Sequence, residues 1–167
     1  MQKYFFILIL SRLSSVLLGQ NTSIDSLINA LNKSQHDTSR IEIYNRLSEK
    51  HLLNLQFEAA MKYAKYGLLL SKNADYKKGL SSSFNHLGHI YLTKGNYDSA
   101  EVALLESIKL SLEIRNKKLS ANTYILLGNV YLSGGKYSKS LEGALSALQL
   151  YDELGDKEGK SNAYGNI

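Results

Sequence analysis

The chain has 167 residues, of which 44% are hydrophobic, so its length suits about one domain with a buried core. It has no cysteine, which excludes disulfide bonds and thiolate metal sites, and no proline, which favours long uninterrupted helices. The formal charge of +5 comes from basic residues scattered as single residues and pairs, a pattern typical of solvated helix surfaces rather than of a nucleic-acid-binding face.

Residues 1–19 have the pattern of a secretory signal peptide. Lys3 gives a positively charged start, residues 4–10 form an apolar run, and Gly19 is a small residue suited to cleavage. Arg12 interrupts the apolar segment, which is also shorter than the ~20 apolar residues that a membrane span needs. We therefore expect an exported, periplasmic protein, with an amphipathic N-terminal helix as the alternative.

A short capping helix and a linker are predicted within residues 20–36. Ser23 is a suitable N-cap, and the aliphatic residues that follow share one helix face: Ile24, Leu27, Ile28 and Leu31. A polar stretch at residues 34–38 ends this helix.

The remainder of the chain repeats at an interval of 40 residues. Leucine recurs at positions 47, 87 and 127, with an aromatic residue three positions before it and a small residue directly after it. The columns are Tyr44, Phe84 and Tyr124; Leu47, Leu87 and Leu127; Ser48, Gly88 and Gly128; His51, Tyr91 and Tyr131; Ala60, Ala100 and Ser140. A fixed period of this size indicates a stacked array of helical units.

Each repeat is expected to contain two helices. The predicted pairs are 39–53 with 56–72, 77–94 with 97–114, and 117–133 with 137–154, and a further helix opens at residue 156. Gly95 and Gly135 are predicted to end helices in the left-handed conformation, and Asn116 and Asp156 to cap the helices that follow. The repeats are therefore 37–75, 76–115, 116–155 and a truncated unit, 156–167.

The recurring columns are predicted to pack the helices together. Gly88 and Gly128 have no side chain, so the two helices of a pair can approach closely there, and the rings fill the wedge between neighbouring pairs. The predicted packing residues are Tyr44, Leu47, Phe84, Leu87, Gly88, Tyr91, Ala100, Tyr124, Leu127, Gly128 and Tyr131.

This pattern resembles the tetratricopeptide repeat, in which an aromatic residue, Leu-Gly and Tyr follow one another in the first helix. The second repeat matches with Phe84, Leu87, Gly88 and Tyr91, and the resemblance extends from residue 37 to the end. The period of 40 departs from the family's usual 34, and the proline that often closes a repeat is absent. The resemblance implies an all-α fold, a right-handed superhelical solenoid of antiparallel helix pairs.

The long repeats and the signal-like start also resemble the N-terminal periplasmic sensor region of Bacteroidetes-type membrane histidine kinases. This implies an exported sensor segment of a two-component signalling protein, anchored in the inner membrane through a C-terminal segment and compatible with a homodimer. Because a first helix restarts at Asp156, we expect an N-terminal fragment of a longer protein. The alternatives are a free-standing exported scaffold or adaptor, and the non-catalytic N-terminal part of an enzyme such as a nucleotide cyclase.

The family's geometry implies that first helices line a concave groove that takes a protein or peptide partner. Exposed positions there would follow the aromatic column by one and five residues and precede it by two. The candidate partner-binding residues are Asn45, Glu49, Asn85, His89, Asn122 and Asn129. An Asn amide can both donate and accept hydrogen bonds, so it suits a peptide backbone.

We expect no catalysis, no cofactor, no metal and no nucleic-acid binding in this segment. His86 and His89 are three residues apart on one predicted helix, but a zinc site needs three or four ligands, and His36 and His51 belong to other elements. Residues 134–135 are a helix-to-helix turn, not the strand-to-helix loop that cradles a phosphate.

Overall fold

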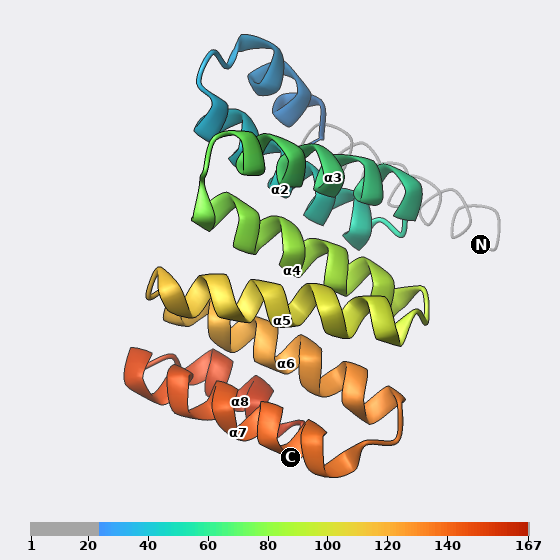
Figure 1. Cartoon of the computed structure of the whole chain (residues 1–167), viewed down its shortest axis with the longest axis vertical. Helices are drawn as coiled ribbons and strands as arrows, with labels where there is room; N and C mark the ends of the chain where they lie inside the picture. Colours follow the sequence, from blue (N-terminus) through green and yellow to red (C-terminus); the bar gives the residue numbers. More distant parts are fainter. Residues whose placement is uncertain (1–23, 167) are drawn as a thin grey trace, which may run out of the picture.

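The computed structural model describes residues 24–166, which form a stack of α-helices (Figure 1). Residues 24–33 are helical, and this described part of the chain contains no strand. The helices that follow are α2 (Asp37–Leu53), α3 (Phe57–Asn73), α4 (Lys77–Thr93), α5 (Tyr97–Glu113), α6 (Lys117–Ser133), α7 (Tyr137–Leu154) and α8 (Lys157–Tyr164). The predicted helices are confirmed with ends that differ by at most two residues, whereas the predicted signal peptide and Ser23 lie outside the described residues.

The turns between helices recur every 20 residues, and each holds one residue with positive φ. These residues are Leu55 (57°), Asp75 (48°), Gly95 (74°), Arg115 (56°), Gly135 (70°) and Gly155 (66°). The left-handed conformation predicted for Gly95 and Gly135 is therefore confirmed. At each turn the next backbone N–H donates to a carbonyl five residues back, as from Asn96 to Tyr91 at 2.9 Å. The same hydrogen bond thus closes the turn with or without a glycine.

The helices form two layers. Each helix packs against its neighbours in the chain, and α2, α4, α6 and α8 also contact one another in sequence. Among the described helices, α3, α5 and α7 make no contact with one another. The first helices of the pairs therefore lie closer together than the second helices do, which makes their layer the concave, inner one.

Small residues bring the two helices of each pair together. A Cβ on Gly88 would lie 2.5 Å from Cγ of Leu104, and a Cβ on Gly143 would lie 3.1 Å from the carbonyl oxygen of Tyr124. In the first pair Ser48 replaces the glycine, and its buried hydroxyl donates to the carbonyl of Ala60 at 2.9 Å. The leucines at positions 47, 87 and 127 are buried beside these contacts.

Buried hydroxyl groups join one helix pair to the next. Ser107 on α5 donates to the backbone carbonyl of Ser81 on α4 at 2.9 Å and lies 3.3 Å from the hydroxyl of Thr123 on α6. The hydroxyls of Ser111 and Ser120 lie 2.8 Å apart at the same junction. These groups are fully buried and hydrogen-bonded, so the junction between pairs is partly polar without the cost of unmet hydrogen bonds.

Candidate partner-binding faces

The inner face is formed by polar side chains of α2, α4 and α6. Glu49 and Asn122 are exposed, and His89 and Asn129 are half-buried. They lie on three successive first helices, which pack side by side, so the structure brings these four predicted residues onto one layer.

Two of the predicted groove residues instead connect the repeats. Asn45 is only 6% exposed, and its Oδ1 accepts a 2.8 Å hydrogen bond from the Ser83 hydroxyl on α4. In the next repeat, Nδ2 of Asn85 donates to the hydroxyl of Thr123 on α6 at 2.9 Å. The position of Asn45 thus differs from the expectation of an exposed groove residue, because a hydroxyl 38 positions later takes up its amide.

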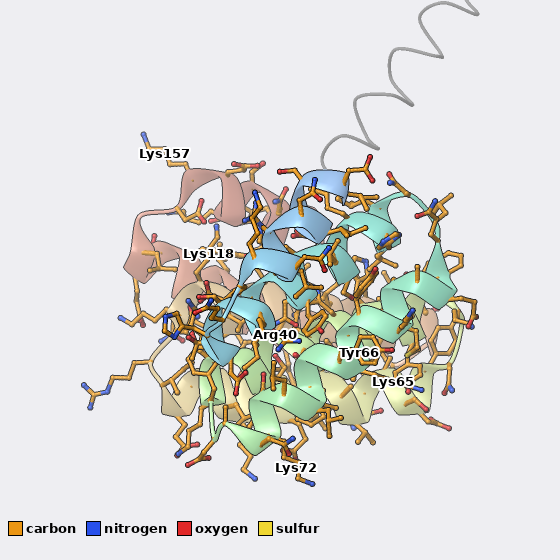
Figure 2. The ribbon with its side chains drawn as sticks, turned by 90° about the horizontal axis from the view of Figure 1, so that it is seen from above. Arg40, Lys65, Tyr66, Lys72, Lys118 and Lys157 are labelled. Atoms are coloured by element: carbon orange, nitrogen blue, oxygen red, sulfur yellow. The ribbon has the colours of Figure 1, made fainter. Side chains whose placement is uncertain are left out.

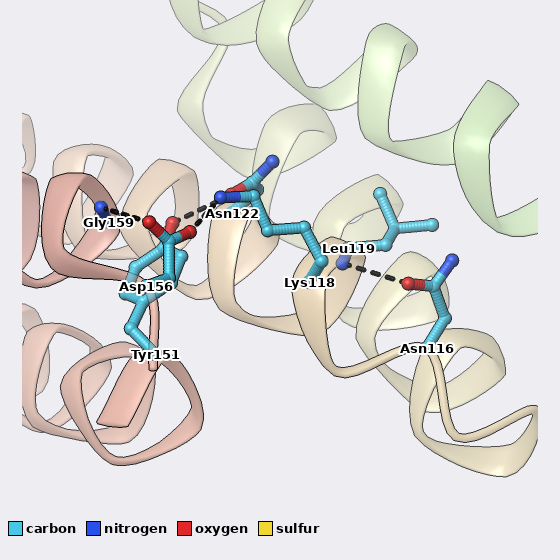
Figure 3. A network of polar contacts seen from close by, with 7 residues as sticks. All are labelled: Asn116, Lys118, Leu119, Asn122, Tyr151, Asp156 and Gly159. Carbon is cyan, nitrogen blue, oxygen red and sulfur yellow. Dashed lines mark hydrogen bonds and ion pairs between the residues drawn. The ribbon is translucent and has the colours of Figure 1, made fainter. Parts of the chain in front are cut away.

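Asn122 belongs to a polar network that joins α6, α7 and α8 (Figure 3). Its Oδ1 accepts a 2.7 Å hydrogen bond from the hydroxyl of Tyr151, and Nζ of Lys118 lies 5.2 Å from the centre of the same ring. Lys118 also pairs with Asp156, whose carboxylate accepts from the backbone N–H of Gly159 at 2.9 Å. The capping role predicted for Asp156 is confirmed.

The two histidines of α4 have lowered pKa values. Burial, with a smaller contribution from His89, lowers the pKa of His86 to about 4. Burial also lowers the pKa of His89, and the negative charge of Glu49 opposes this shift. Both rings are therefore neutral near pH 7. Within residues 24–166, no group of three or more His, Cys, Asp or Glu side chains is arranged to hold a metal ion.

The paired lysines, expected to be solvated, form a regular set of ion pairs between helices. Lys77 pairs with Glu113, and 40 residues later Lys117 pairs with Glu153 at 3.0 Å. Lys78 pairs with Glu42 at 3.0 Å. The 40-residue period could have revealed these pairs, because the lysines and their acidic partners both recur with it.

A pocket that sequence reasoning did not find lies in the outer layer. Its volume is about 520 Å³, and it lies between α3 and α5 above Phe84, Leu87 and Tyr91 of α4. Figure 2 shows Lys65, Tyr66 and Lys72 along α3, one of the helices beside this pocket. We call this site the outer pocket. It exists because α3 and α5 do not touch.

The comparisons with known proteins support the repeat assignment. Residues 79–153, which extend from α4 to α7, match the sequence model of the family described as tetratricopeptide repeat. The predicted resemblance to that repeat is confirmed over these residues. No curated protein matches the sequence significantly.

Among solved structures, the chain is similar to the crystal structure of BtubC (BKLC) from P. vanneervenii. The TM-score is 0.69 at 15% sequence identity, over 87% of this chain and 70% of that chain. At this identity the likeness shows the fold alone, and it confirms the predicted all-α solenoid of antiparallel helix pairs. Among the described helices, none is long and apolar enough to cross a membrane.

Proposed function

We propose that this chain is a protein-binding helical-repeat module that serves as the exported sensor segment of a bacterial two-component signalling protein. The match over residues 79–153 supports the first part, because repeats of this kind generally mediate protein–protein interaction. The pattern of residues 1–19 supports export. The proposal assigns no reaction to the described residues.

The observation that carries the proposal is the polar inner face. Glu49, His89 and Asn129 occupy equivalent positions on three successive first helices, and each retains some exposure. A carboxylate, a neutral imidazole and an amide together offer donors and acceptors to an extended peptide backbone. A partner bound across this face would contact several repeats at once.

Binding on the inner face would be communicated along the stack. Each repeat contacts only its neighbours, so a change in the spacing of two first helices alters the curvature that the next pair inherits. A partner shifts this curvature only as far as it binds one curvature better than the other.

The binding part is tested by placing a photo-crosslinking amino acid at position 129 in living cells. We expect a discrete adduct from position 129 and a weaker one from position 149, because Gln149 is exposed on the outer helix α7. Asn129→Ala, with a crosslinker at position 133, should weaken the adduct without lowering the melting temperature. Equal adducts from positions 129 and 149 would contradict inner-face binding.

The export and sensor parts need separate experiments. Alkaline phosphatase fused after residue 36 should be active, since this enzyme requires an oxidising compartment for its disulfides. Lys3→Glu together with a charge placed in residues 4–10 should abolish that activity. The coding sequence beyond residue 167 should specify a membrane helix and then a histidine-kinase module. A stop codon there would instead favour the free-standing scaffold.

A further inference from the structure

The outer pocket is apolar in its floor and walls. Phe84, Leu87 and Tyr91 form the floor on α4, Leu68 lies on the α3 side, and Val102 lies on the α5 side. Val102 is 65% exposed, although a valine gains free energy when it is removed from water. An open apolar hollow of this size in a helical array marks a candidate interaction site.

The equivalent gap one repeat later, between α5 and α7, is covered by charged side chains. There the floor residue Tyr131 donates its hydroxyl to Glu101 at 3.0 Å, and Nζ of Lys136 and of Lys139 lie 5.6 Å and 5.2 Å from the ring centre. Lys136 also pairs with Glu101 at 3.4 Å. We call Glu101, Lys136 and Lys139 the polar cover. Beneath it Tyr131 is 9% exposed.

The outer pocket lacks the polar cover because the residues 40 positions earlier differ. Met61, Asn96 and Ser99 take the places of Glu101, Lys136 and Lys139, and Val102 takes the place of Glu142. A thioether, an amide and a short hydroxyl cannot form the ion pair and the two cation–π contacts of the next repeat. The same backbone geometry therefore leaves an apolar pocket in one gap and a covered tyrosine in the other.

The rim of the pocket gives it a charge preference. α3 carries exposed lysines at positions 62, 65 and 72, and Lys65 lines the pocket itself. The single acidic residue of α3, Glu58, pairs with Lys94 at 3.0 Å. Asp98 lines the pocket from the start of α5. An acidic group would therefore be attracted to the α3 side and repelled from the start of α5.

We propose that the outer pocket is a second docking site, which takes a segment of another protein bearing a large apolar side chain next to an acidic one. The apolar side chain enters between α3 and α5, and the carboxylate lies toward Lys65. The site lies in the layer opposite the inner face, so it does not rest on the function proposed above. A buried apolar anchor beside a charged rim is a common arrangement at protein–protein interfaces.

The pocket is tested first with two matched dyes. 8-Anilinonaphthalene-1-sulfonate has an aromatic body and an anionic group, and N-phenyl-1-naphthylamine has the same body without the charge. We expect both dyes to bind the protein at one main site. Ser99→Lys/Val102→Glu, which copies Lys139 and Glu142 into the open gap, should weaken both dyes by about tenfold or more.

Two further variants separate the apolar and the charged contributions. Lys65→Glu should weaken the sulfonate dye by about tenfold while changing binding of the neutral dye less than about twofold. Lys139→Ser/Glu142→Val, made in the other gap, should create a second dye site. If the double variant at positions 99 and 102 does not fold, Val102→Lys is used instead, because that side chain is already exposed. Dye binding that all these variants leave unchanged would overturn the proposal.

The class of partner is tested by selecting peptides from a random display library on the folded protein. Selected peptides should combine a large apolar residue with Asp or Glu, and should lose binding to Ser99→Lys/Val102→Glu and to Lys65→Glu. Basic peptides, or peptides that bind these variants equally well, would overturn the proposal. A dimer that Ser99→Lys/Val102→Glu dissociates would assign the pocket to a second copy of the chain instead.

Discussion

Leu55, Asp75 and Arg115 hold a left-handed backbone conformation at turns where the other repeats have glycine. A side chain in this conformation costs about 1–2 kcal/mol because Cβ approaches the following carbonyl oxygen. The turn hydrogen bonds are nevertheless the same, as the 2.8 Å bond from the N–H of Asn116 to the carbonyl of Ser111 shows. Packing of the flanking helices therefore imposes the turn on residues that do not favour it.

Arg115→Gly should raise the free energy of unfolding by about 0.5–1 kcal/mol, because glycine adopts this conformation without the steric cost, although it adds entropy to the unfolded chain. Arg115 is exposed, so little packing is lost. The urea midpoint measures the change. The reverse substitution, Gly135→Arg, should lower the midpoint by a similar amount. A lower midpoint for Arg115→Gly would show that the arginine side chain stabilises the turn.

His86 makes the stability of the fold depend on pH. Its pKa is about 4 in the folded chain, below the ordinary value of 6.5, so between these pH values the unfolded chain binds a proton that the folded chain does not. The free energy of unfolding is therefore expected to fall as the pH drops from 6.5 toward 4, by at most about 1.4 kcal/mol per pH unit from this residue.

His86→Leu tests this dependence, because Leu126 occupies the same column one repeat later. Unfolding followed by circular dichroism between pH 7 and pH 4.5 should show a flatter pH profile for the variant than for the wild type. His89→Leu is the matched comparison, since the pKa of that ring is lowered as well. Identical profiles for His86→Leu and the wild type would exclude His86 as the source.

The columns of leucine and glycine could be predicted at the residue scale, but the role of Asn45 could not. Leu47, Leu87 and Leu127 follow from the period alone, because one side chain type repeated at a fixed spacing must face a repeated neighbour. Asn45 reads as a polar surface residue until Ser83 is placed beside it by the packing of α2 on α4. One sequence without a three-dimensional arrangement does not specify such a partner.

Side-chain capping distinguishes the helices at the scale of elements. Asn96, Asn116 and Asp156 each accept a hydrogen bond from a backbone N–H in the first turn, at 3.2, 3.2 and 2.9 Å, whereas α2, α3, α4 and α7 have no side-chain cap. The predictions for Asn116 and Asp156 are confirmed by these contacts, and Asn96 was missed. A side-chain cap satisfies a donor that the helix itself leaves unpaired.

Asn116→Ala should lower the free energy of unfolding by about 1 kcal/mol through loss of the cap of α6, and Asn116→Asp should retain most of it. Aspartate also gains from the positive N-terminal end of the helix dipole. Thermal unfolding of the three proteins measures the difference. Equal losses for the alanine and aspartate variants would show that the amide nitrogen of Asn116, rather than its oxygen, stabilises the helix start.

Helix positions could be predicted closely because periodicity, turn residues and the absence of proline agree. The turn at Leu55 was the weak point, since leucine carries no turn signal, and it became clear only from the positive φ at every twentieth residue. The outer pocket could not be predicted, because it depends on the absence of contact between α3 and α5.

The molecule as a whole is an array in which each element depends on its neighbours. α8 contacts only α7 and α6, and Tyr151 of α7 is 3% exposed against Gly159 of α8. Damage at one end should therefore decline with distance along the stack rather than unfold the whole chain equally.

Removal of residues 155–167 tests this directly. Exposing a large side chain such as Tyr151 costs about 1.5–3 kcal/mol, so amide hydrogen exchange in α7 should become roughly 10–100-fold faster. Exchange in α2 and α3 should stay the same. A uniform increase across α2 to α7 would show that the array unfolds as a single cooperative unit.

The uniform spacing of the turns has a consequence for how such an array can grow. Because inner and outer helices have the same turn geometry every 20 residues, the main chain does not encode which layer a helix belongs to. Layer identity resides in side chains that alternate with twice that spacing, such as Gly88 inside and Leu104 outside. A gene duplication of 40 residues therefore preserves parity. One of 20 residues would close every turn correctly and still place each later helix in the wrong layer.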